Sequence, residues 1–252
     1  MNTIQKISTA ALLVASPLAA VAAEISGNVS LTSDYRFRGI SQSDTQLAVQ
    51  GGFDVGFENG LYAGVWGSNV DFGSWSGSAP DLELDYYAGL AGDITEDVSF
   101  DVGYIYYDYP GASSQNLGFG SVDFDYEEVY ASVSFGDFTL GGAYSDDYWL
   151  ESGDFYYVYG DYSFALPMEV SMDLHYGFNS FDNDSTDAGA DGAQAFLSGG
   201  EDSYSDYSVT FTKAFAGVDV SVSWVDTDLS QSELFGSNWA DSTVVVAISK
   251  SL

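Results

Sequence analysis

The feature that most constrains the fold is an alternation of short and long connections between twelve segments that share one pattern. In each segment apolar and polar residues alternate with a period of two, which is typical of a β-strand with one apolar face. Connections after even-numbered segments are short, such as 58–60 and 136–137, whereas most of those after odd-numbered segments are longer, up to 182–202. The segments span residues 25–38, 47–57, 61–71, 82–92, 98–109, 125–135, 138–147, 155–164, 170–181, 203–213, 218–227 and 243–252.

An even number of strands with short turns on one side and longer loops on the other is the pattern of an outer-membrane barrel. A strand of about 11 residues at ~3.3 Å each, tilted by ~40°, spans roughly 28 Å, enough to cross the apolar band of such a barrel. The sequence therefore predicts an all-β fold, a transmembrane antiparallel up-and-down β-barrel of about 12 strands. A periplasmic β-sandwich or a soluble barrel is the alternative, because it also alternates.

The alternation assigns a face to each side chain. In the ninth segment Leu174 and Tyr176 fall on the apolar face, and Asp173 and His175 on the polar one. The third segment is ambiguous, because two apolar sets compete. Aromatic residues gather at both strand ends, where we expect girdles at the membrane interfaces. Those beside the long connections are Tyr35, Phe37, Tyr104, Tyr106, Tyr144, Tyr176, Phe178 and Trp224.

The N-terminus has the pattern of a secretory signal. Lys6 precedes a small, apolar stretch, Pro17 interrupts it, and small residues fill 19–23. We therefore predict a signal peptide at 1–23, export through the Sec pathway, and a barrel domain at 24–252. No later stretch approaches the length of a transmembrane helix. The expected location is the outer membrane of a Gram-negative cell, in contact with lipid and lipopolysaccharide.

Composition excludes several classes of function. The chain carries 38 acidic residues against 5 Lys and Arg, a net charge of −33, which argues against nucleic-acid binding. It has no Cys, and a single His, so Cys-based and multi-His metal sites are excluded. We predict no cofactor and no metal site.

Several stretches resemble a known family. They are SLTSDYRFRGISQSDTQ (30–46), GSNVDF (67–72), ELDYYAG (83–89), YIYYDYPG (104–111) and EEVYASVS (127–134). They are similar to the proteobacterial Gcw_chp family, also described as TorF-family porins. The resemblance implies an exported outer-membrane channel with no established substrate. It implies no catalytic residues.

If the apolar face meets lipid, the polar face lines a lumen rich in carboxylates. The predicted pore-lining residues are Asp34, Arg36, Arg38, Asp54, Glu83, Asp85, Asp101, Glu128, Asp161, Asp173, His175, Asp206 and Asp219. Ten acids cannot all be neutralised by two arginines, so they would hold mobile cations or a cationic solute, or shift their pKa values. This favours a cation-preferring pore. An acidic surface suited to a saline habitat is the alternative.

Three features of the predicted interior leave alternatives open. Arg36 and Arg38 would either create a transverse field across the pore or pair with acids on neighbouring strands. Inward aromatic residues would either stack a planar or sugar-like solute or fill space; this set is Tyr87, Tyr107, Tyr109, Tyr130, Phe155, Tyr157 and Tyr159. The loop 182–202 would either fold inward as a gate or stay outside, and its acidic run fails the EF-hand pattern.

Catalysis has little support. A lipid hydrolase would need His175 as its base with Asp173 to orient it, but both fall on the inward face and no nucleophile elbow is present. We therefore predict a porin that passes small hydrophilic solutes by diffusion and prefers cations, and is not an enzyme. The alternatives are a substrate-specific channel for a cationic or aromatic nutrient and a non-conducting structural or adhesive barrel. Whether barrels associate as homo-oligomers stays open.

Overall fold

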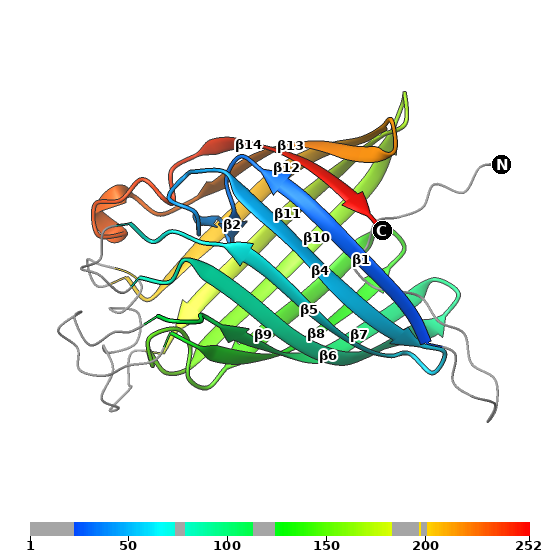
Figure 1. The fold of residues 1–252 in the computed structure, drawn as a ribbon, viewed down its shortest axis with the longest axis horizontal. Coiled ribbons are helices and arrows are strands. Elements are labelled where there is room, and N and C mark those ends of the chain that lie inside the picture. The colour runs from blue at the N-terminus through cyan, green and yellow to red at the C-terminus, as the bar shows by residue number, and fades with distance from the viewer. Residues whose placement is uncertain (1–22, 74–78, 113–123, 183–196, 198–200) are drawn as a thin grey trace.

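The computed structural model describes residues 23–73, 79–112, 124–182, 197 and 201–252. In this part of the chain twelve strands form one closed barrel (Figure 1). They are β1 (Ala23–Thr32), β4 (Ala48–Phe57), β5 (Leu61–Asn69), β6 (Leu82–Thr95), β7 (Val98–Asp108), β8 (Tyr126–Phe135), β9 (Phe138–Ser145), β10 (Phe155–Leu166), β11 (Val170–Phe181), β12 (Ser203–Phe215), β13 (Val218–Thr227) and β14 (Thr243–Ser251). Neighbours pair antiparallel, and β1 pairs with β14 to close the ring. The predicted fold class is confirmed.

The connections alternate in length as predicted. The short turns lie at one end of the barrel and the long connections at the other (Figure 1). Residues 136–137 and 216–217 join their strands by two-residue turns, which need a left-handed backbone that glycine adopts without strain. Gly136 has φ +57° and Gly217 φ +84°. The connection between β13 and β14 contains a single 3-10 turn, η3 (Gln231–Glu233).

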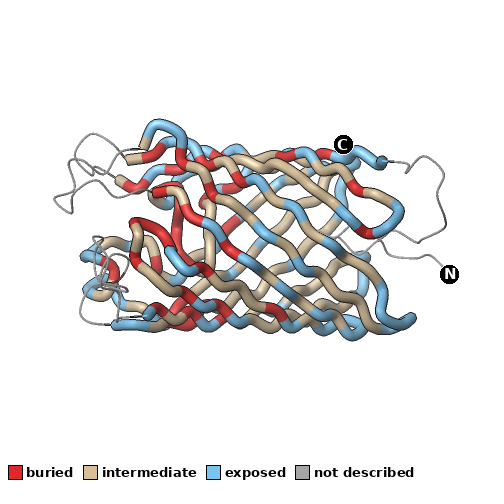
Figure 2. The backbone as a smooth tube through the Cα atoms, turned by 90° about the horizontal axis from the view of Figure 1, so that it is seen from below, coloured by how far each residue is buried: buried red, intermediate tan, exposed pale blue. Residues whose placement is uncertain are grey.

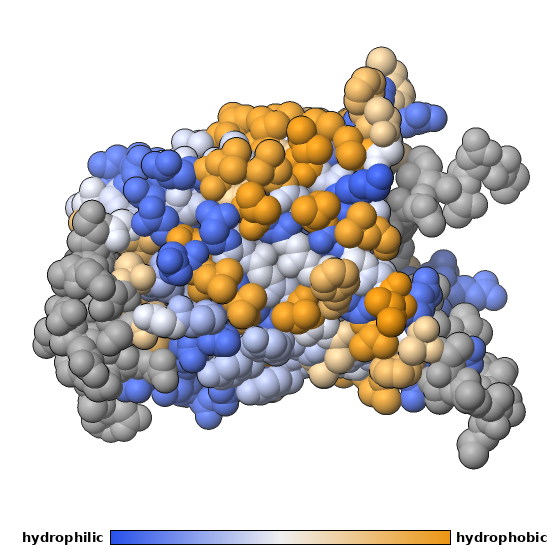
Figure 3. All heavy atoms as spheres, in the orientation of Figure 1, coloured by the Kyte–Doolittle hydropathy of each residue, from blue (hydrophilic) through white to orange (hydrophobic). Residues whose placement is uncertain are grey.

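An apolar belt covers the outside of the strands. Its side chains alternate with inward ones along each strand, so large apolar groups such as Phe53 and Val158 are more than half exposed. Figure 3 shows these residues gathered over the strands, with hydrophilic residues toward the end with the long connections. The ambiguous third segment is resolved, because Leu61 is exposed on the belt whereas Tyr62 and Trp66 face inward. No helix among the described residues has the length and apolar character needed to span a bilayer.

The first predicted segment is the one that differs most from the structure. β1 ends at Thr32, and residues 33–47 form a connection, here called the inner loop, that folds into the barrel. It contains a two-stranded sheet of β2 (Arg36–Phe37) and β3 (Ile40–Ser41). Arg38 at φ +47° and Gly39 at φ +82° form the tight turn that joins them.

Two predictions for this region are therefore wrong. The period-two pattern placed Arg36 and Arg38 on the polar face of a membrane strand, but both lie in the inner loop. It placed Tyr35 and Phe37 in the outer aromatic girdle, but both pack against the buried core inside the barrel. The physical reason is the turn at Arg38 and Gly39, which reverses the chain while the alternation continues through it.

Buried residues gather at the end of the barrel with the long connections (Figure 2), and most of them are aromatic residues of one packed core. Tyr148 stacks on Phe155 with ring centroids 4.0 Å apart, and Tyr107 stacks on Tyr126 at 4.3 Å. Such pairs add about 0.5–1.5 kcal/mol each beyond the burial of their area. This aromatic core comprises Phe72, Tyr107, Tyr109, Phe124, Tyr126, Tyr148, Trp149, Phe155, Tyr157, Phe181 and Tyr204.

Two predictions fall on segments that are largely outside the described residues. The predicted signal peptide covers 1–23, and the description begins at Ala23. In the loop 182–202 only Asp182, Leu197, Glu201 and Asp202 are described. The signal peptide and the gating role of that loop stay predictions.

Candidate functional site in the barrel lumen

The inner loop crosses the interior of the barrel. The Tyr35 hydroxyl donates to Glu83 Oε1 on β6 at 2.7 Å, whereas the Tyr204 hydroxyl on β12 donates to the Arg38 carbonyl at 3.1 Å. In the strand order β6 and β12 are six positions apart in a ring of twelve, and so lie on opposite sides. A loop that touches both must span the lumen. Burial, followed by the Glu83 carboxylate, raises the pKa of Tyr35, which keeps its phenol a donor.

Arg38 is the main anchor of the inner loop. Its Nη1 and Nη2 donate to Glu128 Oε1 and Oε2 on β8 at 2.7 and 2.9 Å, a bidentate pair. Its guanidinium also lies 4.6, 4.8 and 4.3 Å from the ring centroids of Phe37, Phe155 and Tyr157. Burial alone would lower the pKa of Arg38, but the Glu128 carboxylate raises it above its usual value. The cation is thus held between three rings and one carboxylate.

Arg36 is also used within the protein. Its Nε donates to Asp34 Oδ2 at 2.6 Å, and its Nη1 donates to the carbonyls of Gly39, Trp239 and Asp241. These contacts tie the inner loop to the connection that follows β13. Each arginine therefore forms an ion pair: Arg36 with Asp34 within the inner loop, and Arg38 with Glu128 on β8.

The described residues line two sizeable cavities in the lumen. The larger, of about 1010 Å³, extends to residues at the short-turn end such as Glu24 and Ser251. The smaller, of about 460 Å³, lies against Arg38, Tyr157 and His175. They meet at the inner loop and the strands facing it, since seven residues line both: Arg36, Phe37, Ile105, Tyr107, Tyr130, Ser208 and Val225.

The predicted pore-lining residues are distributed over both cavities. The larger is lined by Asp34, Arg36, Asp54, Asp85, Asp101 and Asp219. The smaller is lined by Arg36, Arg38, Glu128, His175 and Asp206. The remaining three, Glu83, Asp161 and Asp173, line neither of these two cavities. Glu83 is instead buried under the hydroxyls of Tyr35 and Tyr109.

Inward tyrosine rings lie flat along the wall because glycines stand beside them. A Cβ added at Gly64 would come within 2.4 Å of the Tyr87 ring, and one at Gly103 within 2.3 Å of the Tyr130 hydroxyl. The same arrangement recurs for Tyr62 over Gly89, Tyr159 over Gly141 and Tyr157 over Gly177. Because each ring occupies the space a side chain would fill, it covers the wall without crossing the passage.

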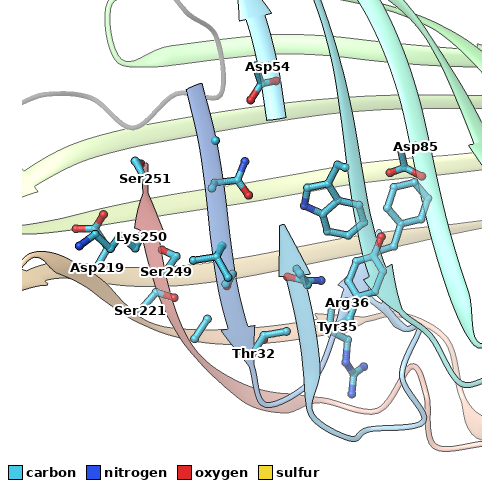
Figure 4. Close-up of a pocket in the computed structure, with 18 of the residues that line it drawn as sticks. Thr32, Tyr35, Arg36, Asp54, Asp85, Asp219, Ser221, Ser249, Lys250 and Ser251 are labelled. Atoms are coloured by element: carbon cyan, nitrogen blue, oxygen red, sulfur yellow. The ribbon is translucent and has the colours of Figure 1, made fainter. Parts of the chain in front are cut away.

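The larger cavity has two unlike walls. One, from β4 to β8, carries carboxylates and phenols that are bonded to each other, as in Tyr62 to Asp101 at 2.6 Å and Tyr87 to Asp54. The other, from β12 to β1, carries small hydroxyls together with the carboxylates of Asp219 and Glu24, and Figure 4 shows Ser221 and Ser249 facing the cavity across from Tyr35 and Asp85. Carboxylates therefore stand on both walls of this cavity, whereas the phenols bonded to them stand on one.

His175 is held by two carboxylates. Its Nδ1 lies 2.6 Å from Asp161 Oδ1 and its Nε2 lies 2.9 Å from Asp206 Oδ1, while the Tyr157 hydroxyl also contacts Nε2 at 2.9 Å. The predicted neighbour Asp173 instead accepts from the Ser163 hydroxyl. The histidine therefore belongs to a closed polar network on the lumen wall. Among the described residues no group of three His, Asp or Glu could hold a metal ion.

Three residues that line the lumen were missed by the sequence reasoning. Tyr62 and Trp66 lie on the ambiguous third segment, so their inward direction was not assigned, although both line the larger cavity. Gly39 was not singled out, yet a Cβ there would approach Thr227 Cγ2 to 2.4 Å and Asp206 Cβ to 2.9 Å. The signal available in the sequence was Gly39 itself, because a glycine that directly follows the alternating residues 36–38 favours a turn.

The family profile described as "Bacterial protein of unknown function (Gcw_chp)" matches residues 17–252. The chain belongs to the Gcw_chp family. This confirms the resemblance found in the sequence, and the family description assigns no function. A search of curated protein sequences finds no match.

Among solved structures, the barrel is similar to the NanC porin, with 11% sequence identity and a TM-score of 0.51 over 90% of this chain and 98% of that chain. It is also similar to the KdgM porin, with 8% identity and a TM-score of 0.49 over 92% and 99% of the two chains. At this identity the similarity to the NanC porin shows only a common fold, in which nearly the whole of both chains is matched.

Proposed function

We propose that this chain is an outer-membrane channel that passes small hydrophilic solutes by diffusion, prefers cations and performs no catalysis. The observation that carries the proposal is the pair of adjoining cavities inside a closed barrel, which share lining residues of the inner loop and of the strands facing it. Selection would depend on the width left beside that loop and on the field of the lumen. The apolar belt would contact outer-membrane lipid and lipopolysaccharide.

The charge of the lumen supports the preference for cations. Asp34 and Glu128 form ion pairs with Arg36 and Arg38, and the other eight carboxylates of the predicted set have no arginine partner in the described residues. Two of these eight, Asp161 and Asp206, bond to His175. Carboxylates inside a low-dielectric wall attract cations and repel anions.

Reversal potentials in planar bilayers test this proposal. The purified, refolded chain would be placed between chambers of unequal KCl concentration, and the zero-current voltage would be measured. We expect a voltage of the sign that indicates K⁺ permeation over Cl⁻. A preference for Cl⁻ would contradict the charge argument, and a barrel without conductance would contradict the channel itself.

A second candidate is a non-conducting structural or adhesive barrel. The aromatic core and the anchored inner loop favour it, because together they fill the end of the interior that carries the long connections. The same bilayer measurement separates the two functions. Single-channel current steps large enough for hydrated ions support the channel, whereas bilayers that contain folded barrels but carry no current support the structural function.

Export and assembly are part of the proposal. Residues 1–23 would direct the chain through the Sec pathway, and the barrel would reside in the outer membrane of a Gram-negative cell, alone or as a homo-oligomer. Membrane fractionation with and without residues 1–23 tests the first point. Accumulation of the shortened chain in the cytoplasm is the expected result, and its normal arrival in the outer membrane would contradict the assignment.

A further inference from the structure

The Oδ1 atom of the Asp85 carboxyl group on β6 is buried and has no hydrogen-bond partner among the residues that the structure describes. The Asp85 side chain lines the larger cavity, yet the residue is only 6% exposed, and no donor in the described residues reaches its Oδ1. Burying a carboxyl group without a hydrogen-bond donor destabilises the fold, and more so for the charged form than for a neutral group. The other buried atoms without a partner, Ser145 Oγ and Asn179 Oδ1, are uncharged. The described part of the protein therefore supplies no hydrogen-bond donor to Asp85 Oδ1.

The acids around Asp85 already have partners. Glu83 accepts from the Tyr35 and Tyr109 hydroxyls, and Glu128 accepts from Arg38 and Tyr107. Both carboxylates interact electrostatically with Asp85, so they add negative potential at its position. The place is therefore prepared for a positive charge that comes from outside the chain.

Asp85 has an aromatic residue opposite it on each neighbouring strand. In the sheet register Trp66 on β5 and Tyr107 on β7 stand directly opposite it, and all three residues line the larger cavity. Directly opposed residues have Cβ atoms about 4.5–5.5 Å apart. The Tyr35 ring lies edge-on to Trp66 with centroids 5.5 Å apart, which extends the aromatic surface into the inner loop. Figure 4 shows Tyr35 and Asp85 on the same side of the cavity.

This combination of groups matches the chemistry of an organic ammonium. Aromatic faces attract cations through their quadrupoles, and more strongly where water is excluded. A carboxylate with free acceptor positions needs N–H donors, which a primary ammonium has and a quaternary ammonium lacks. A metal ion fits less well, because no group of three ligating side chains is present among the described residues.

We propose that Asp85, Trp66 and Tyr107 form a binding site for the primary ammonium group of an organic amine, at the level where the inner loop meets the larger cavity. The ammonium donates to the Asp85 carboxylate and its first methylene groups lie against the two rings. This binding site deepens the proposed function. It rests on that function because the solute must reach the site along the lumen. The site would make the passage selective for amines within a generally cation-preferring pore.

Calorimetric titration of the full chain in detergent micelles tests the site without requiring conduction. The probes are n-butylammonium chloride and, at the same concentrations, tetramethylammonium chloride and sodium chloride. We expect saturable binding of butylammonium and weaker binding of the other two. The absence of saturable butylammonium binding would overturn the proposal, and so would tetramethylammonium that binds equally well.

Two matched variants locate the site. Asp85→Asn keeps the shape of the side chain and removes its charge, and it is expected to weaken butylammonium binding by at least about tenfold, or about 1.4 kcal/mol. Asp54→Asn removes the same charge from the same wall, but Asp54 is already bonded by Tyr87, so its affinity for butylammonium should change by less than about twofold. An equal loss in both variants would reduce the effect to net charge and overturn the site.

Folding is checked by circular dichroism. Should Asp85→Asn fail to refold, Trp66→Leu replaces it. We expect this variant to bind butylammonium several-fold more weakly, and an unchanged affinity would contradict the site. Conductance of the same preparations separates this proposal from the channel. A chain that conducts but does not bind butylammonium overturns the site alone, whereas one that binds but does not conduct supports the site and overturns the proposed function.

Discussion

The two ends of the barrel interior are filled in different ways by the same twelve strands. Toward the short turns the inward residues are small hydroxyls and carboxylates, such as Ser221 and Asp101, which border an open cavity. Toward the long connections they are large aromatic rings, such as Phe155 and Tyr204, which are almost fully buried. The inner loop lies at the boundary between them. The strand scaffold therefore fixes the width of the barrel, and the inward side chains decide where it is open.

The largest expected effect comes from removing the anchor at this boundary. Arg38→Met keeps an apolar stem against the rings but leaves Glu128 buried without its partner, so we expect a loss of about 3–5 kcal/mol in the free energy of unfolding. The inner loop should also detach, which would raise single-channel conductance. Urea unfolding and bilayer recordings measure the two effects.

The double variant Arg38→Met/Glu128→Gln is the control for this prediction. Because it removes the buried charge as well, it should recover part of the stability while the conductance stays high. Conductance equal to that of the unmodified chain in both variants would mean that the inner loop does not narrow the passage.

The next effect tests how closely the inner loop fits the strands. Gly39→Ala places a methyl group against Thr227 and Asp206, so it should displace the turn. Gly111→Ala is the matched control, because Gly111 has nearly the same φ, +81° against +82°, and nothing within 4 Å of its added Cβ. We expect Gly39→Ala to cost about 1–3 kcal/mol more than Gly111→Ala in urea unfolding. Equal costs would show that backbone strain alone matters at Gly39.

A smaller effect is expected in the open half. Gly64→Ala forces the Tyr87 ring away from the wall and toward the lumen, at a stability cost of about 0.5–1.5 kcal/mol for the displaced rotamer. Single-channel conductance should fall. In the double variant Gly64→Ala/Tyr87→Ser the ring is absent, so the conductance should return to at least its original value. If the double variant stays low, the ring is not the cause.

The smallest effect concerns selectivity. Asp101→Asn removes one carboxylate that lines the larger cavity, so the reversal potential should shift slightly toward that of a less cation-selective pore. Glu83→Gln removes the same charge from a residue that lines neither cavity and should leave the reversal potential nearly unchanged. The opposite ranking of the two variants would place the conduction path near Glu83.

Most of the fold could be predicted because it depends on local patterns. The period of two and the alternating connection lengths located eleven strands to within three residues at each end. The first strand failed for a physical reason. The side chains of Tyr35 and Phe37 alternate with arginines just as a membrane strand would, and only the left-handed turn at Arg38 and Gly39 sends them inward.

The sequence could predict which side chains face the lumen, but not which of them bond to one another. Alternation placed residues such as Asp54 and Asp219 on the inward face, where the structure has them along a cavity. It could not show that Glu128 binds Arg38, 90 residues away, or that Asp85 has no donor. Such contacts depend on the closure of the ring and on the path of one loop across it.

The pairing of the first strand with the last has a consequence for how the chain reaches its final state. β1 cannot complete its hydrogen bonds until β14 has been delivered, and the inner loop that follows β1 needs β6, β8 and β12 at the same time. Contacts so distant in sequence are slow to form, because long segments must be brought together before any interaction compensates for the lost entropy. Any catalyst of membrane insertion must therefore keep the free edge of β1 unpaired until β14 reaches it.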